Sequence, residues 1–460
     1  MSFPAYPAYK NSGSDRLGDV PAHWEVVPCR AIVDECVEKN SLGKITEYLS
    51  LMANIGIIRY EDKGDVGNKK PDDLSKCKIV KKGDLVINSM NYGIGSYGLS
   101  PLDGICSPVY IVLDPRDDVI QERFALRIFE EKEFQAFAQS FGNGILAHRS
   151  AIGWDDLKNI LVALPPLPEQ TLLSNFLDHE TAHIDALIEE QQRLIELLKE
   201  KRQAVISHAV TKGLDPTVPM KDSGVEWLGE VPAHWRVIKL GLLASDRCDG
   251  PFGSALKSEH YTDEGVRVIR LQNIKSGWFN DTDSAFIDAG YYRENIGKSD
   301  VVAGDVLIAG LGDDNNPVGR ACVAPENIAP AMVKADCFRF RLMPDVAASE
   351  FIALQLTAGA NADAGILSTG STRSRIPLSS MSTRLIALPP VSEQKSIVSF
   401  IQRLNENIDS LFSEAQSGIA LLQERRSALI SAAVTGKIDV RGWQPPASIQ
   451  APAPAVAEAV

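Results

Sequence analysis

Three short stretches of the chain have residue types and spacings that could support cofactor binding or catalysis. The first is Gly93–Gly98, GIGSYG, a formal G-x-G-x-x-G pattern that follows an apolar run. A dinucleotide site needs a helix to begin at this loop, because the pyrophosphate binds at the helix N-terminus. The next ten residues, LSPLDGICSP, contain two prolines and a glycine, so they favour a turn. We therefore interpret the segment as a β-turn loop.

The other two patterns are also incomplete. Asp314–Gly319, DNNPVG, resembles part of the Asn-Pro-Pro-aromatic signature of amino-methyltransferases but lacks the second proline and the aromatic residue. His179 and His183 are spaced i, i+4 and could share one face of a helix, but zinc needs at least a third ligand. We interpret them as solvated histidines. The sequence thus predicts no catalytic residue and no metal site, and it is typical of a binding scaffold.

The composition favours a cytoplasmic protein. Seven cysteines are scattered without C-x-x-C spacing, which fits reduced thiols better than a disulfide framework. No run of about 18 apolar residues predicts a membrane span, and the first residues, MSFPAYPAYKNSG, lack the apolar segment of a secretory signal. The formal net charge of −13 argues against nucleic acid as a partner, although a basic face can exist locally on an acidic protein.

The chain is an internal repeat of two long units. The offset between matching strings grows from 211 to 224 residues along the unit, so the second copy carries 13 extra residues in its middle. A period of this length is far too long for a solenoid and indicates two whole domains. The matching strings are VPAHWEV (Val20–Val26) with VPAHWRV (Val231–Val237), KKGDLVI (Lys81–Ile87) with VAGDVLI (Val302–Ile308), and LPPLPEQ (Leu164–Gln170) with LPPVSEQ (Leu388–Gln394).

Each unit ends in a long helix. After LPPLPEQ, which is typical of a helix start, about 43 residues pass before Gly213, and at ~1.5 Å per residue this helix is roughly 60 Å long. A narrow apolar seam at heptad spacing needs a partner helix, and the second copy is the economical one, packed antiparallel about a pseudo-twofold axis. The predicted seam is Ile184, Leu187, Gln191, Leu194, Leu198, Lys201 and Val205, matched by Ile408, Leu411, Ala415, Gly418, Leu422, Arg425 and Leu429.

The polar members of this seam leave two interpretations open. Gln191, Lys201 and Arg425 are either register markers of an ordinary coil or part of a surface for a second protein. The rest of each unit is rich in Gly, Pro and Asp with short apolar runs, which predicts a curled β core with short helices. In the strand CFRFRL, Arg339 and Arg341 alternate with apolar residues, and we interpret them as a solvated sheet face.

The order of these landmarks resembles that of the specificity (S) subunits of type I restriction-modification systems. Two variable modules alternate with two long helices. Each module begins at VP-x-x-W and each helix at LPP-x-x-EQ, over about residues 15 to 440. The resemblance implies that each module is a target recognition domain for one half of a bipartite DNA sequence. It also implies that the paired helices set the spacer between the two halves.

The resemblance implies partners as well. In this family two modification (methyltransferase) subunits dock on the helices, and restriction subunits with a helicase motor and a nuclease join them. S-adenosylmethionine, ATP and Mg²⁺ belong to those partners, so we expect no cofactor and no active site in this chain. We expect double-stranded DNA as the ligand and no association with a membrane.

DNA contacts are expected on polar loops, because base reading needs donors and acceptors that can enter the major groove. Candidate loops follow each GD strand, precede each LPP element, and open the second module; the counterpart in the first module, with Asn54 and Arg59, is less basic. An ordinary exposed turn is the alternative for each. The predicted DNA-binding residues are Asn88, Ser89, Asn91, Tyr92, His148, Arg149, Ser150, Ser254, Lys257, Arg270, Gln272, Asn273, Asn315, Asn316, Arg320, Ser371, Thr372, Arg373 and Arg375.

The predicted fold class is α+β, with two globular target recognition domains separated by two long antiparallel helices that form a coiled coil. Two alternatives to the type I specificity subunit stay open: the specificity subunit of a type IIB-like restriction system, and a protein–protein scaffold that does not bind DNA. The predicted divisions are 1–163 (recognition domain 1), 164–212 (central helix), 213–387 (recognition domain 2), 388–440 (C-terminal helix) and 441–460 (a Pro/Ala-rich disordered tail).

Overall fold

The computed structural model describes residues 3–66, 69–141, 151–252, 255–313, 315–363 and 374–444. The chain divides into two compact units, Met1–Gln192 with Gln416–Val460 (unit 1) and Arg193–Ala415 (unit 2). Each unit contains one globular module and part of both long helices, so the unit boundaries cut the helices rather than the module ends. We call the globular parts module 1 and module 2; the limits given from the sequence stay predictions.

Module 1 is built on a four-stranded antiparallel sheet in the order β4-β11-β8-β9. Every residue of β8 is buried, because α1 and β5 both pack against this strand. The elements are β1 (Tyr9–Asn11), β2 (Asp19–Pro21), β3 (Glu25–Pro28), β4 (Val33–Glu35), β5 (Leu49–Met52), β6 (Gly56–Arg59), β7 (Lys78–Val80), β8 (Leu85–Asn88), β9 (Tyr97–Leu99), β10 (Gly104–Cys106), β11 (Tyr110–Pro115), α1 (Glu122–Glu130), α2 (Lys132–Ser140), α3 (Trp154–Leu157) and β12 (Leu161–Leu164).

Module 2 repeats this sheet as β16-β25-β21-β23 and adds a five-stranded sheet in the order β17-β19-β18-β24-β20. The elements are β13 (Met220–Asp222), β14 (Glu230–Pro232), β15 (Arg236–Lys239), β16 (Ala244–Asp249), β17 (Tyr261–Thr262), β18 (Val266–Ile269), β19 (Phe286–Ile287), α5 (Ala289–Tyr291), β20 (Asp300–Val301), β21 (Val306–Ala309), β22 (Leu311–Gly312), β23 (Ala321–Val323), β24 (Ala331–Val333), β25 (Cys337–Leu342), α6 (Ser349–Asp363), β26 (Ser374–Arg375), α7 (Leu378–Thr383) and β27 (Leu385–Leu388).

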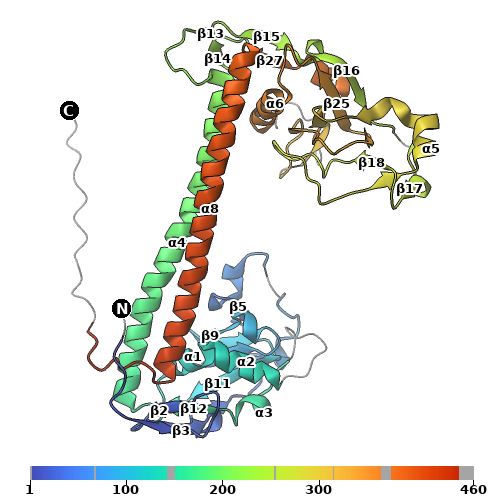
Figure 1. Ribbon diagram of the computed structural model, residues 1–460. Coiled ribbons are helices and arrows are strands. Elements are labelled where there is room, and N and C mark those ends of the chain that lie inside the picture. Colours follow the sequence, from blue (N-terminus) through green and yellow to red (C-terminus); the bar gives the residue numbers. More distant parts are fainter. Residues whose placement is uncertain are drawn as a thin grey trace. The chain divides into compact units, whose positions relative to one another are not determined.

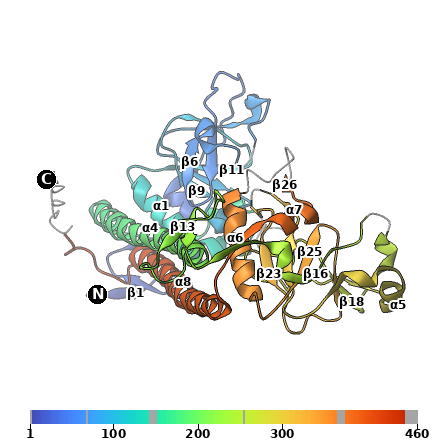
Figure 2. The same ribbon diagram turned by 90° about the horizontal axis from the view of Figure 1, so that it is seen from above.

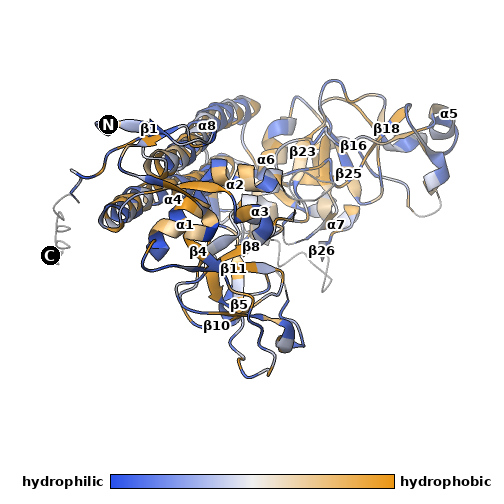
Figure 3. Ribbon diagram, turned by 90° about the horizontal axis from the view of Figure 1, so that it is seen from below, coloured by the Kyte–Doolittle hydropathy of each residue, from blue (hydrophilic) through white to orange (hydrophobic). Residues whose placement is uncertain are grey.

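The two modules share one frame and differ in what is added to it. In both, a hairpin precedes the module (β1–β2 and β13–β14), and its first long strand pairs with its last (β3–β12 and β15–β27). The strands of the shared sheet carry the hydrophobic residues of each core, as β23 and β25 show in Figure 3. The antiparallel pair β7–β10 of module 1 has its counterpart in β20–β24 of module 2. The modules differ in what stands beside this pair, which is the hairpin β5–β6 in module 1 and the strands β17, β18 and β19 in module 2. The predicted α+β class and internal repeat are confirmed.

The long helices are α4 (Leu167–Lys212, 46 residues) and α8 (Val391–Val434, 44 residues). They lie side by side and antiparallel within each unit (Figures 1 and 2). In unit 1, Arg426 Nε lies 2.9 Å from Asp185 Oδ1, and in unit 2 Arg202 pairs with Asp409. The offset of 224 residues carries Arg202 onto Arg426 and Asp185 onto Asp409, so the two ion pairs are one interaction made twice. This identity confirms the predicted pseudo-twofold relation of the helices.

The predicted apolar seam is only partly buried. Ile184, Ile408 and Ala415 are buried, whereas Leu194 and Leu411 are exposed. Two helices cover only one narrow stripe of each other, so these two leucines keep much of their surface in water. The prediction that they form part of a buried apolar seam was wrong.

Both sequence landmarks meet at the start of each long helix. In unit 1, Trp24 Nε1 donates to Glu169 Oε1 at 3.1 Å, and His23 Nε2 lies 2.8 Å from Glu169 Oε2. In unit 2 the equivalent distances from Trp235 Nε1 and His234 Nε2 to Glu393 are 3.0 and 2.8 Å. The VPAHW string therefore binds the glutamate of the LPP-x-x-EQ string and fixes each module on its helix.

The neighbouring glutamine forms a second fixed contact in both units. Gln170 Nε2 donates to the carbonyls of Pro165 (2.9 Å) and Val119 (3.0 Å), and its Oε1 accepts from Gln121 N at 2.9 Å. Gln394 makes the same three bonds, to Pro389 O, Val346 O and Ala348 N. A buried amide with both ends paired holds one geometry, which accounts for the repeated "EQ".

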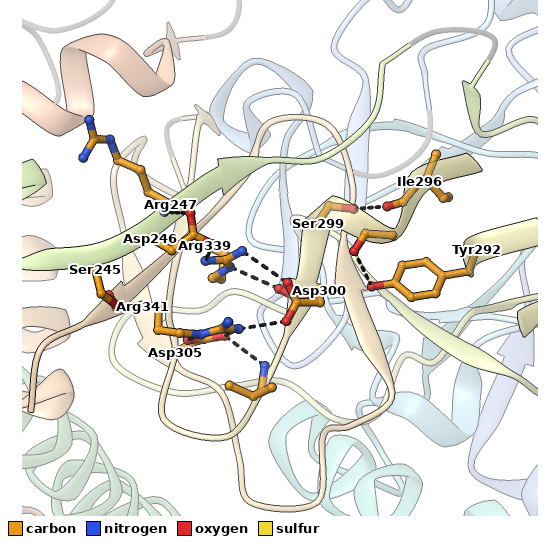
Figure 4. A network of polar contacts seen from close by, with 12 residues as sticks. Ser245, Asp246, Arg247, Tyr292, Ile296, Ser299, Asp300, Asp305, Arg339 and Arg341 are labelled. Atoms are coloured by element: carbon orange, nitrogen blue, oxygen red, sulfur yellow. Dashed lines mark hydrogen bonds and ion pairs between the residues drawn. The ribbon is translucent and has the colours of Figure 1, made fainter. Parts of the chain in front are cut away.

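Arg339 corrects the interpretation of CFRFRL as a solvated face. Its side chain is fully buried on β25, where NH1 donates to Asp246 on β16 at 2.7 Å and Nε donates to the carbonyl of Asp300 on β20 at 3.1 Å (Figure 4). The guanidinium thus joins the four-stranded sheet to the five-stranded sheet. A period-2 pattern cannot reveal this, because a second sheet covers the face that would otherwise meet water.

The GD motif has opposite electrostatic surroundings in the two modules. In module 2, Arg341 donates to both carboxylate oxygens of buried Asp305 at 3.0 and 2.9 Å. The strand register puts Asp114 at the equivalent place in module 1, beside buried Asp84. A ligand atom of each carboxylate and Cys36 Sγ all lie within 4.8 Å of one another. Burial first, and Asp114 in addition, raise the pKa of Asp84.

Replacing Asp114 with arginine is therefore expected to stabilise the protein. The substitution Asp114→Arg places the bidentate pair of module 2 in module 1 and should raise the free energy of unfolding by ~1–2 kcal/mol. A raised pKa means that the wild type loses stability as pH rises from the ordinary carboxyl range to the raised value. The gain should therefore grow as pH rises through that range.

Urea unfolding of the full chain at several pH values measures this gain. Asp114→Asn is the matched control, since it removes the repulsion without adding a donor for both oxygens. Equal stabilities of the two variants at neutral pH would show that no guanidinium–carboxylate pair forms.

Candidate nucleic-acid interface

Three of the predicted contact loops of module 2 come together at one end of its central sheet. The segment before the LPP element pairs with the loop after the GD strand, as β26 with β22. Ile376 N donates to Gly310 O at 2.9 Å, and Arg375 bonds to Asp336 at 2.9 Å while lying over the ring of Phe252, 5.6 Å from its centroid. The loops around residues 252, 311 and 375 therefore form one surface.

Arg320 connects this surface to a fourth loop from within. The side chain is buried and donates five hydrogen bonds to backbone carbonyls at 2.8–3.2 Å. Three go to Leu311, Asn316 and Pro317 on one loop, and two go to Leu271 and Ile274 on the other. Its donors are directed into the protein, so the expected role in contacting DNA is revised. Arg320 positions the loops.

The fourth loop is organised around one carboxylate. Arg270 NH2 donates to both oxygens of Asp283 at 2.5 Å, and Gln272 Nε2 donates to Asp283 Oδ2. Asn273 is fully buried and donates to the carbonyls of Asn280 (2.9 Å) and Asp283 (2.7 Å). Asn273 is thus a structural residue, which also revises its predicted role, while Arg270 and Gln272 reach the surface already paired.

Of the remaining described candidates of module 2, Asn315 and Lys257 are exposed, whereas Asn316 is half-buried and its Nδ2 donates to Asp313 Oδ1 at 3.1 Å. Asn315 and Asn316 belong to a turn in which Asp313 Oδ1 accepts from both of their backbone amides, at 3.0 and 2.8 Å. Lys257 lies at the surface with its Nζ 3.6 Å from Glu259. The arrangement leaves the Asn315 amide and the Lys257 ammonium accessible to a ligand.

Module 1 brings the corresponding loops together in the same way. Ile152 N donates to Ser89 O at 3.2 Å, which is the contact that Ile376 makes in module 2. Asn91 and Ser89 are at least partly exposed, whereas Asn88 is buried and caps the turn through Met90 N at 3.1 Å.

Tyr92 is fully buried and donates to Phe129 O at 2.5 Å. Burial raises its pKa well above the ordinary value. Its expected role as a DNA contact is therefore also revised: the ring belongs to the core, and the hydroxyl fixes the loop to α1.

The described loop after β8 and the turn between β5 and β6 in module 1 carry exposed apolar side chains. Met90 and Ile94 are exposed on the loop after β8, and Ile55 is exposed on the turn between β5 and β6. This turn is fixed to the loop by the bond from Asn54 N to Gly95 O at 2.9 Å. Module 1 therefore presents a surface of different chemistry from that of module 2, which offers amides and guanidinium groups.

Seven of the predicted contact residues lie outside the described part of the chain: His148, Arg149, Ser150, Ser254, Ser371, Thr372 and Arg373. The C-terminal stretch from residue 445, where the tail is predicted, lies outside it as well. Residues 151–152, which follow His148–Ser150, and residues 374–376, which follow Ser371–Arg373, are each hydrogen-bonded to the loop after the GD strand of their module.

Other chemistry has little support in the described residues. All seven cysteines are free. Burial, and then Asp84 and Asp114, raise the pKa of Cys36 to about 11, so this thiol is protonated near neutral pH and is not an activated nucleophile. Among the helices of the described ranges, none has the length and apolar character that crossing a membrane requires.

The fold and the loops define a class: two related modules, each of which gathers polar or apolar loops at one end of a sheet and is fixed to an antiparallel helix pair. Comparison with solved structures supports this class. The chain matches the HsdS subunit of Thermoanaerobacter tengcongensis with a TM-score of 0.52 and 18% identity, over 91% of this chain and 98% of that chain. It matches a chain from a structure of the type I R-M system with a TM-score of 0.64 and 17% identity, over 90% and 98%.

Sequence comparison gives the same result. No family model matches the chain. The type I restriction enzyme MjaVIII specificity subunit of Methanocaldococcus jannaschii is 23% identical over 440 residues, 92% of this chain and 94% of that protein. The EcoBI specificity subunit of Escherichia coli is 23% identical over 299 residues, 63% of this chain and 60% of that protein. The resemblance to type I specificity subunits drawn from the sequence is confirmed.

Proposed function

We propose that the chain is the non-catalytic specificity subunit of a type I restriction-modification system and binds a bipartite DNA sequence. The supporting observation is that both modules bring the same two loops together: the carbonyl of the residue after the GD strand, Ser89 or Gly310, accepts from the segment that precedes the LPP element, at 3.2 and 2.9 Å. Because each module has its own loop surface and its own long helix, each could bind one half of a bipartite target. Half-sites about one helical turn apart would face the same side of B-DNA.

The proposed contact residues are those that reach solvent. In module 1 they are Ser89 and Asn91, and in module 2 Lys257, Arg270, Gln272, Asn315, Asn316 and Arg375. The candidates outside the described residues complete the set. Amide and guanidinium groups suit adenine and guanine edges, and apolar groups suit the thymine methyl, so the two half-sites should differ in composition.

The helices offer equivalent places for two copies of a partner. Leu197 is 53% exposed on α4, and Leu421, its equivalent at the offset of 224, is 66% exposed on α8. A partner that covered each of these leucines would remove apolar surface from water at two equivalent places. We assign these two places to two modification subunits, which with the restriction subunits supply S-adenosylmethionine, ATP and Mg²⁺ chemistry. The assembly would act on DNA in the cytoplasm.

The test uses the chain assembled with its modification subunit. The expected complex contains two modification subunits by mass measurement and selects one bipartite sequence from a random duplex library at about 150 mM salt, with specific binding ~10³-fold or more tighter than non-specific binding. Equal binding of all duplexes would contradict the proposal and favour the protein–protein scaffold. A partner with a fused nuclease would indicate the type IIB-like arrangement.

A further inference from the structure

Arg270 and Gln272, two candidate contacts on the fourth loop of module 2, share one carboxylate before any DNA is bound. Arg270 Nη2 donates to both carboxylate oxygens of Asp283 at 2.5 Å, and Gln272 Nε2 donates to the same carboxylate. The side chains of Arg270 and Asp283 are 29% and 31% exposed. The cluster therefore lies at the surface, within reach of a ligand, but with its positive charge already balanced.

The backbone that carries these side chains is fixed. Asn273 Oδ1 accepts from Arg270 N at 2.8 Å, and Asn273 N donates to Arg270 O at 2.9 Å, which closes the turn from both sides. Arg320 holds the same turn from below through the carbonyls of Leu271 and Ile274. With the backbone fixed, the direction of the Arg270 and Gln272 side chains depends on their common partner.

Asp283 is charged in the free protein. Burial opposes ionisation, but the hydrogen bonds of Gln272 and Arg270 outweigh it and lower the pKa of Asp283. A charged carboxylate on a guanidinium changes what the guanidinium prefers. A phosphate of non-target DNA would have to displace the carboxylate of Asp283, and it would gain little electrostatic attraction because the guanidinium is already neutralised. A base edge, in contrast, can accept from the guanidinium donors that the carboxylate leaves free.

We propose that Asp283 is a specificity-determining positioning residue of module 2. Its negative charge weakens the attraction between Arg270 and the phosphates of non-target DNA. Its hydrogen bonds hold Arg270 and Gln272 in the orientation that reads a base edge. This inference rests on the proposed function. It assigns to an acidic residue, which repels DNA, a role in choosing the sequence.

The neighbouring pair Arg267–Asp281 supplies a matched control. Asp281 also binds an arginine, but Arg267 is held independently, by the carbonyl of Asp283 at 3.2 Å and over the ring of Phe279, 5.2 Å from its centroid. Asp281→Asn thus removes the same charge as Asp283→Asn without releasing a reading side chain.

The experiment measures affinity for the selected target and for a scrambled duplex across a salt series, with the assembled complex. Asp283→Asn is expected to raise affinity for the scrambled duplex by ~3–10-fold and to steepen its salt dependence by about one unit of slope. It should lower the ratio of specific to non-specific affinity by ~10-fold or more. Asp281→Asn should leave that ratio within about twofold of the wild type.

Two further variants separate positioning from charge alone. Asp283→Glu keeps the charge and should return the scrambled-duplex affinity to the wild-type level. The double variant Arg270→Met, Asp283→Asn removes both charges and should also restore that affinity, while the discrimination stays lost. Circular dichroism confirms that each variant is folded.

The outcomes are distinct. If Asp283→Asn and Asp281→Asn raise scrambled-duplex affinity equally and preserve discrimination, the effect is one of net charge and the inference is overturned while the proposed function stands. If the wild-type complex shows no target preference, the proposed function is overturned and the role of Asp283 with it.

Discussion

Exchanging residues 20–163 for the equivalent segment of another specificity subunit is expected to change one half of the recognised sequence completely and the other half not at all. Module 1 has its own core and a closed frame, because its first long strand β3 pairs with its last strand β12. The module is joined to α4 through Trp24 and Glu169. A donor segment that begins with the same VP-x-H-W string therefore keeps this contact.

Sequencing of methylated bases in cells that carry the exchanged subunit reads out both half-sites and the spacer at once. Exchange of residues 231–387 is the reciprocal control and should alter the other half alone. A change in both halves after a single exchange would contradict independent reading by the two modules. A changed spacer with unchanged halves would place the spacing in the modules rather than in the helices.

Removing the carboxylate of Glu169 is expected to cause the largest loss of stability. In unit 1 this residue accepts from Trp24 Nε1 at 3.1 Å and from Tyr6 OH at 2.6 Å, and its side chain is only 7% exposed. Glu169→Ala leaves two buried donors without an acceptor, each at a cost of about 1–3 kcal/mol, so we expect a total of ~3–5 kcal/mol.

The equivalent residue of unit 2 provides the comparison. Glu393 accepts from Trp235, no residue that the structure describes takes the place of Tyr6 beside it, and its side chain is 29% exposed. Glu393→Ala should therefore lower the free energy of unfolding by only ~1–2 kcal/mol. Chemical denaturation of the full chain measures both. Equal losses for the two variants would show that the Tyr6 bond contributes nothing, and Glu169→Gln, which keeps an acceptor, should lose less than Glu169→Ala.

The architecture could be predicted because the sequence contains an internal repeat. Repeated strings such as VPAHW and LPP-x-x-EQ lie in elements that both units need, and the long helices are marked by the absence of Pro and Gly. The repeat also predicted the antiparallel helix pair, which the equivalence of Arg202 and Arg426 confirms. The contact of the Trp and His of VPAHW with the Glu of LPP-x-x-EQ could not be predicted, because the partners are about 145 residues apart in the chain.

The contact surface was less predictable, because polarity does not reveal which way a side chain points. Tyr92, Asn273 and Arg320 have the right chemistry for DNA, but their polar groups bond to backbone carbonyls inside the modules. The role that we propose for Asp283 was not predicted, because an acidic residue is not expected beside DNA. The weak signal was its place 13 residues after Arg270, in a segment where acidic residues alternate with turn residues.

The duplicated ion pair has a consequence for the origin of the chain. Each half carries one Asp and one Arg of the helix contact, Asp185 with Arg202 and Asp409 with Arg426, so a single half holds both sides of a self-complementary interface. An ancestral protein of half the length could pair with itself about a twofold axis. Such a homodimer would bind inverted identical half-sites, a palindrome. Duplication and fusion of its gene would free each half to mutate without altering the other, and would make an asymmetric target accessible to selection.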